Sequence, residues 1–185
     1  MMNKPNEIKE EEIIQDFLND FRPIILAPEM EKAFLSHFTA NFRSGYNLAE
    51  SHLVRTISHY QVLGEFIRAE RNLKFACGQV LAKHSFGWPE IETFGSLYGA
   101  LCATIDVGFT SDRYIPDQQN HTELLNYTKR IRESFDKMEQ DLKQNKLDFQ
   151  IRFAFLKKRL DLAAEKNSKN KQPLIEGMSR IMCKE

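Results

Sequence analysis

The 185-residue chain carries 26 acidic side chains and 26 Lys or Arg side chains, so its formal net charge is zero. Without net charge, no whole-protein field draws the chain to DNA or to an anionic membrane. Hydrophobic residues make up 42% of the sequence, and 14 residues are phenylalanine, which is enough apolar volume for the core of one domain.

Cysteine usage and the N-terminal sequence indicate the compartment. Cys77, Cys102 and Cys183 are widely spaced, so we expect reduced thiols and neither a disulfide framework nor a zinc knuckle. The sequence MMNKPNEIKEEE lacks the apolar segment of a signal peptide. We therefore expect a cytoplasmic protein, although export by a signal-less route would leave the same features.

The N-terminal half is predicted to contain three helices. Hydrophobic periodicity indicates a first helix over residues 7–22, with its acids facing solvent, and a second over 28–42. The pattern is interrupted at 43–45, and a sequence like a capping box follows. The longest helix is therefore expected over residues 47–84.

Residues 88–109, WPEIETFGSLYGALCATIDVGF, are the least charged long stretch. Pro89 suits the first position of a helix, and the apolar stripe is broad enough to predict a mostly buried helix. Only thirteen uncharged residues separate Glu92 from Asp106, whereas a membrane span needs about 20. The sequence therefore predicts a buried helix rather than a membrane helix.

Gly95 and Gly99 lie on one side of this predicted helix. Each costs roughly 1 kcal/mol of helix propensity relative to alanine, and close approach of another helix would offset that cost. We expect Gly64 or Gly78 on the preceding helix to meet this groove. Gly108 is expected to close the helix in a left-handed conformation.

The C-terminal half begins with a predicted exposed loop at 110–120. Amphipathic patterns then predict helices over 120–145 and 149–163 that pair as an antiparallel hairpin. Residues 167–172 have the composition of a linker. The predicted fold is an all-α, single-domain bundle of six or seven helices around a buried central helix at 88–109. Residues 1–166 form this domain, and 167–185 form a flexible linker with a short amphipathic helix.

No spacing typical of a catalytic or metal site is present. His52 and His59 are seven residues apart, whereas a zincin helix needs histidines at i and i+4 and a di-iron bundle needs Glu-x-x-His. Arg55 and His59, four apart on one predicted helix face, resemble the Arg-x(4–6)-His element of HEPN-type ribonucleases with one residue fewer. That resemblance implies a helical, often dimeric RNase.

Asp106 lies near the end of the apolar helix, where an ionised carboxylate needs a partner. Arg113 or a loop amide is the expected partner, which makes an ion pair or cap a better interpretation than catalysis. No catalytic residue, metal ligand or cofactor is predicted.

The sequence favours a non-enzymatic protein–protein interaction module, such as an adaptor, an inhibitor or a small accessory subunit. Its partner and its oligomeric state stay open, including a homo-oligomer. A bundle enzyme with a Glu/His site ranks last. The predicted partner-binding residues are those of the apolar tail: Leu174, Ile175, Met178, Ile181 and Met182.

The alternative is a nucleic-acid-associated regulator that binds phosphates through cations on helix faces. Its predicted contacts fall in two groups: Arg68, Arg71 and Lys74, and then Lys157, Lys158 and Arg159.

Overall fold

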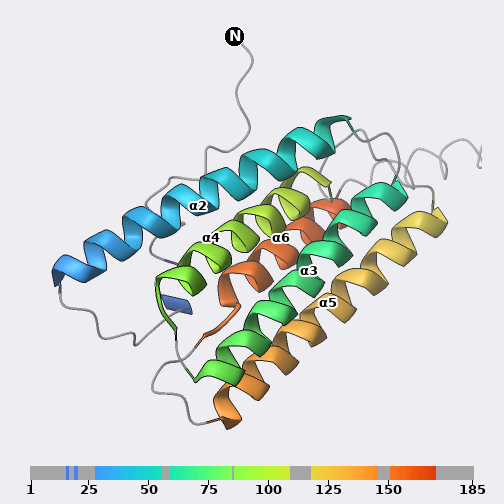
Figure 1. Cartoon of the computed structure of the whole chain (residues 1–185). Helices are drawn as coiled ribbons and strands as arrows, with labels where there is room; N and C mark the ends of the chain where they lie inside the picture. The colour runs from blue at the N-terminus through green and yellow to red at the C-terminus, as the bar shows by residue number, and fades with distance from the viewer. Residues whose placement is uncertain are drawn as a thin grey trace, which may run out of the picture.

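The computed structural model describes residues 16, 19–20, 28–55, 59–84, 86–108, 118–145 and 151–169. These residues contain no strand, which confirms the all-α class. The predicted helix at 7–22, apart from three residues, and the tail at 170–185 lie outside the described residues. The elements are α2 (Pro28–Arg55), α3 (His59–Lys83), α4 (Trp88–Ala103), the π-helical turn η1 (Thr104–Gly108), α5 (Gln118–Gln144) and α6 (Ala154–Lys169) (Figure 1).

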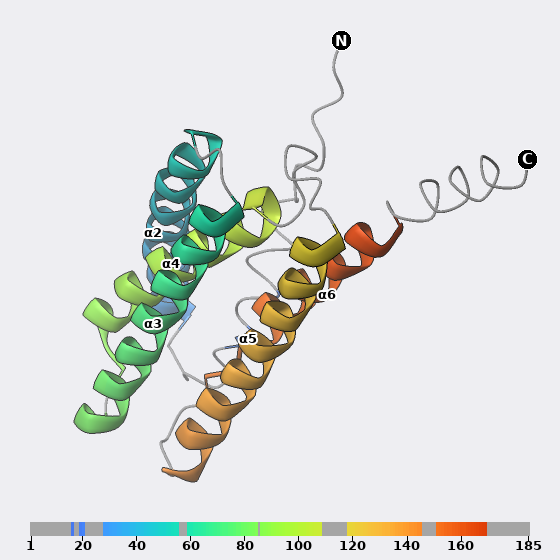
Figure 2. The same cartoon turned by 90° about the vertical axis from the view of Figure 1, so that its right-hand side faces the viewer.

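The helices form two layers (Figure 2). One layer contains α2, α4 and α3, with α4 in contact with both neighbours, and the other contains α5 and α6. Contacts between α3 and α5 and between α4 and α6 join the layers. Helices α3 and α4 run antiparallel, as do α5 and α6, which confirms the predicted hairpin (Figure 1).

The N-terminal helix boundaries differ from the prediction. Helix α2 runs without interruption from Pro28 to Arg55, so the predicted break at 43–45 is wrong. The predicted helix over 47–84 is also wrong, because α2 ends at Arg55 and α3 begins at His59. Gly45, interpreted as a helix breaker, lies buried inside α2 and faces α4. Its missing side chain permits helix contact and does not end the helix.

Close packing of α2 on α4 explains the glycines of α4. Gly95 and Gly99 are both buried, as predicted. A Cβ at Gly95 would lie 3.0 Å from the Phe38 carbonyl oxygen, and Cβ atoms at Gly99 and Gly45 would overlap backbone atoms of the facing helix. The predicted contact with Gly64 or Gly78 is wrong, because α2 fills the groove and neither of those glycines has an atom near its Cβ position.

The ends of α4 show how the predicted helix at 88–109 is bounded. The Gly87 N–H donates to the Glu90 carboxylate at 2.9 Å, and Pro89 occupies the first turn. At the other end the helix widens into η1. The hydroxyl of Thr104, the first residue of η1, donates to the Ala100 carbonyl at 2.8 Å. No described glycine has a positive φ, so the left-handed ending at Gly108 is wrong.

The core is rich in phenylalanine. The amphipathic patterns that predict helices over 120–145 and 149–163 are confirmed for their described apolar positions, which are all buried: Ile131, Phe135, Met138, Leu142, Phe153, Leu156, Leu160 and Ala163. No helix in the described part of the chain combines the length and apolar character needed to span a bilayer.

Candidate functional site

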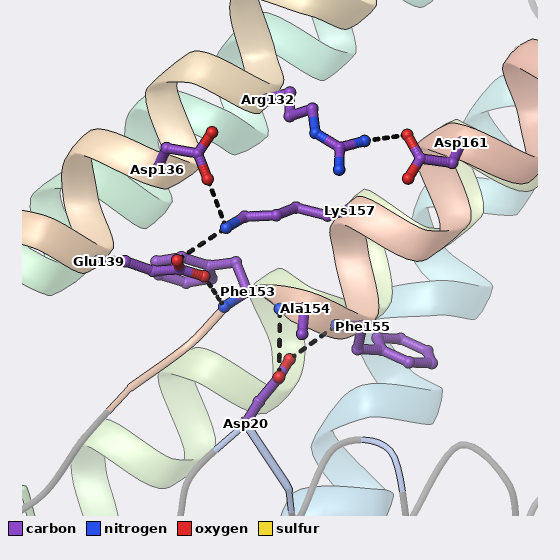
Figure 3. A network of polar contacts seen from close by, with 9 residues as sticks. All are labelled: Asp20, Arg132, Asp136, Glu139, Phe153, Ala154, Phe155, Lys157 and Asp161. Atoms are coloured by element: carbon purple, nitrogen blue, oxygen red, sulfur yellow. Dashed lines mark hydrogen bonds and ion pairs between the residues drawn. The ribbon is translucent and has the colours of Figure 1, made fainter.

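The first turn of α6 obtains its cap from a distant residue. Residues 151–153 are Ile, Arg and Phe, none of which has a side chain suited to helix capping. The Asp20 carboxylate accepts hydrogen bonds from the N–H groups of Ala154, at 3.1 Å, and Phe155, at 3.0 Å (Figure 3). An acid of the predicted first helix therefore caps α6, and for Asp20 the expected solvent-facing position is wrong.

Asp20 is only 1% exposed. Burial raises the pKa of its carboxyl from an ordinary value of 3.8 to about 7, although the two hydrogen bonds from the backbone of Phe155 and Ala154 lower this pKa. The nearby charge of Glu139 raises this pKa further, and that of Lys157 lowers it. A buried acid that titrates near neutrality makes this cap sensitive to pH.

Lys157 connects α6 to two acids of α5. Its ammonium group lies 2.6 Å from Asp136 and 2.7 Å from Glu139. Burial opposes the charge of Lys157, but these carboxylates outweigh it and raise the pKa of the ammonium group. The second oxygen of Glu139 accepts the Phe153 N–H at 2.6 Å, so it also caps the start of α6 (Figure 3). These contacts fix the start of α6 against α5.

A second ion pair joins η1 to α6. The Arg159 guanidinium donates to both oxygens of Asp106, with Nε at 3.0 Å from one of them. Burial raises the pKa of Asp106, while the Arg159 charge opposes this shift. The partner of Asp106 that the structure describes is Arg159 of α6, which the sequence did not predict. Arg113 and the loop amides lie outside the described residues, so pairing with them stays a prediction. The predicted role as an ion pair is confirmed.

The predicted phosphate-binding cations are mostly paired with acids. Of the first group, Arg68 lies 2.5 Å from Glu65 and Lys74 lies 2.6 Å from Glu70. Of the second group, Lys158 lies 2.9 Å from Asp16, and Lys157 and Arg159 bind the acids described above. The structure does not join the two groups, because they lie on α3 and α6, which belong to different layers.

The histidine and arginine candidates lie at a helix boundary. Arg55 is the last residue of α2 and His59 the first residue of α3, so their predicted placement on one helix face is wrong. The same boundary separates His52 from His59. Among the described residues, no three His, Cys, Asp or Glu side chains group in a way that could hold a metal ion.

Comparison of the chain with protein-family models, curated proteins and solved structures gives no match. Functional inference therefore rests on the geometry of the molecule. A hollow of about 330 Å³ on α5 and α6 is lined largely by charged residues. Among them are the Arg132–Asp161 ion pair and Lys158, whose partner is Asp16.

The outward face of α3 has a different character. Phe75 is 69% exposed there, more than the other exposed large hydrophobic residues in the described part of the chain. Gly64 and Gly78 are exposed on the same helix, and a Cβ at either would have no atom within 4 Å. We name this face the α3 stripe; it consists of six exposed residues: Gly64, Arg68, Arg71, Phe75, Gly78 and Ala82.

Sequence reasoning missed Asp20 and Phe75. The absence of a capping residue before Ala154 signals that α6 needs a cap from elsewhere, but it does not say from where. For Phe75, the helical stripe that buries Leu73, Cys77 and Val80 leaves residue 75 on the opposite face. The predicted partner-binding residues of the tail, from Leu174 to Met182, lie outside the described residues.

Proposed function

We propose that the protein is a non-enzymatic protein–protein interaction module, and that its binding surface is the α3 stripe. Its partner on this surface is a helix. The observation that carries the proposal is the exposure of Phe75 between two glycines at which a Cβ would have no atom of the described chain within 4 Å.

The cost of the two glycines supports this proposal. Each glycine inside a helix destabilises it by roughly 1 kcal/mol relative to alanine. At Gly45, Gly95 and Gly99 the close contact between α2 and α4 offsets this cost. At Gly64 and Gly78 nothing within the described chain does. A helix that packed against α3 from outside would supply the missing compensation.

Phe75 supports the same surface. A phenylalanine buries 150–250 Å² when it packs, and aromatic side chains are enriched at protein interfaces and in their hot spots. The stripe also has cations next to this ring, and Arg71 forms no hydrogen bond or ion pair with any described residue. A large apolar anchor with a neighbouring arginine is typical of the centre of an interface.

The nucleic-acid alternative has less support. Binding of phosphates requires cations that are free to neutralise them, and five of the six predicted residues are in ion pairs with acids. Arg71 is the sixth. The tail from Leu174 to Met182 stays a second predicted partner surface on sequence grounds alone.

The test compares affinity captures by the full chain, by Phe75→Ser and by Gly78→Leu, with proteins identified by mass spectrometry. Leu48→Ser is the matched control, because Leu48 is 63% exposed on α2, outside the stripe. We expect a partner that the parent chain and the control retain and that both stripe variants lose. Equal capture by all four proteins would contradict the proposal.

A further inference from the structure

The α3 stripe has a spacing that reads the same in both directions. Its residues follow one another at intervals of four, three, four, three and four, which is the seam spacing of a coiled coil. A second copy of the stripe laid antiparallel on the first therefore places every stripe residue opposite another. The facing pairs are Gly64 with Ala82, Arg68 with Gly78, and Arg71 with Phe75, each pair occurring twice.

These pairs are complementary in size and charge. The long Arg68 side chain faces Gly78, where the Cβ position has open space. Arg71, which no described residue pairs, faces the exposed ring of Phe75, and an arginine over an aromatic ring is attractive. Gly64 and Ala82 at the two ends are both small, so the backbones can approach there. No arginine of the stripe faces an arginine.

The residues beside the stripe fit the same arrangement. In an antiparallel pair with this register, Asn72 lies next to its own copy, and two amide side chains can exchange hydrogen bonds. On the other flank, Ile67 approaches the partner's Leu81, and both are only partly exposed in the single chain. Lys74 also approaches its own copy, but its charge is already paired with Glu70 at 2.6 Å.

We propose that the helix bound by the α3 stripe is α3 of a second copy of this chain, packed antiparallel in the register described above. The inference rests on the proposed function and names its partner. One helix pair is small beside the roughly 1,600 Å² of a standard interface. The dimer is therefore expected to be weak, with dissociation in the micromolar range.

Sedimentation of the full chain over a range of concentrations tests the oligomeric state. We expect the mass to rise toward twice the 21.6 kDa of one chain. Phe75→Asn and Gly78→Leu should raise the dissociation constant at least about tenfold, while Leu48→Asn on α2 leaves it unchanged. Far-UV circular dichroism shows that each variant keeps its helices.

Cysteine cross-linking tests the register. Cys183→Ser removes one native thiol, and the other two, Cys77 and Cys102, are buried. In this background, the Gly64→Cys protein, the Ala82→Cys protein and a mixture of the two whose subunits have been allowed to exchange are each oxidised. We expect disulfide dimers in the mixture and none in either protein alone, because two copies of residue 64 lie roughly 27 Å apart along the helix. Cross-linking of Gly64→Cys to itself would overturn the antiparallel register.

The outcomes separate the two proposals. A chain that stays monomeric at every concentration overturns the second-copy inference but leaves the proposed function in place if both stripe variants still lose a captured partner. A monomer whose stripe variants capture the same proteins as the parent overturns both. A dimer that Phe75→Asn and Gly78→Leu leave intact forms elsewhere and overturns the second-copy inference.

Discussion

Gly99→Ala adds one methyl group to α4 where it meets α2. A Cβ at residue 99 would overlap the Phe42 carbonyl oxygen and lie 2.8 Å from the Tyr46 backbone nitrogen. Both atoms belong to the backbone of α2, so no side-chain rotation can relieve the overlap. Helices α2 and α4 must move apart, and their contact over Phe38 and Phe42 loosens with them.

The size of this effect follows from two opposed terms. Alanine improves helix propensity over glycine by roughly 1 kcal/mol. Overpacking costs roughly 1–3 kcal/mol, and more where backbone must shift, as it must here. Since the separation also weakens packing along α2, we expect Gly99→Ala to lower the free energy of unfolding by about 2–4 kcal/mol.

Gly78→Ala is the matched control, because it makes the same chemical change where the Cβ meets open space. In the single chain it should raise the free energy of unfolding by roughly 0.5–1 kcal/mol. Urea denaturation at low protein concentration, followed by circular dichroism, measures both changes as shifts in the midpoint with an unchanged slope. If the two substitutions changed stability by the same sign and amount, the reasoning from backbone contact would be wrong.

The remaining predictions concern the charged groups. Because folding raises the pKa of Asp20 to about 7, its contribution to stability is complete below pH 4 and is lost as the pH rises to 7; the loss is at most roughly 4 kcal/mol. Asp20→Asn should remove this slope from urea midpoints measured between pH 4.5 and 8, and a variant that kept the full slope would refute the assignment. Arg159→Leu should destabilise by about 2–3 kcal/mol because it removes the guanidinium that binds the largely buried Asp106 carboxylate, and adding Asp106→Leu should restore most of the loss in a double-mutant cycle. Arg132→Ala breaks a pair with Asp161 whose side chains are 46% and 56% exposed, so thermal unfolding should show a change below about 1 kcal/mol; a larger change would mean that this pair is not a surface salt bridge.

The parts of the fold that the sequence predicted correctly depend on local pattern. The helix beginning at Trp88, the hairpin of α5 and α6, and the burial of Gly95 and Gly99 follow from periodicity and helix-start signals within a few residues. The need of Asp106 for a partner is predictable for the same reason, since a charged residue in an apolar helix is evident from its sequence neighbours.

The parts that it missed depend on tertiary contact. A glycine weakens an isolated helix, so the sequence predicts a break at Gly45. In the folded chain, Gly45 instead permits close contact between α2 and α4. The boundary between Arg55 and His59 has no proline or glycine to mark it. The partner of Asp106 and the cap of α6 come from residues far along the chain, which periodicity cannot connect.

The cap of α6 also sets an order of events during synthesis of the chain. Asp20 and the two amides it binds are 134 and 135 positions apart in the sequence. Contacts over such distances form late, because the intervening chain must first be brought together. A ribosome would therefore release most of the chain before Asp20 meets its amides, and a nascent chain stalled before Ala154 would carry this acid without them.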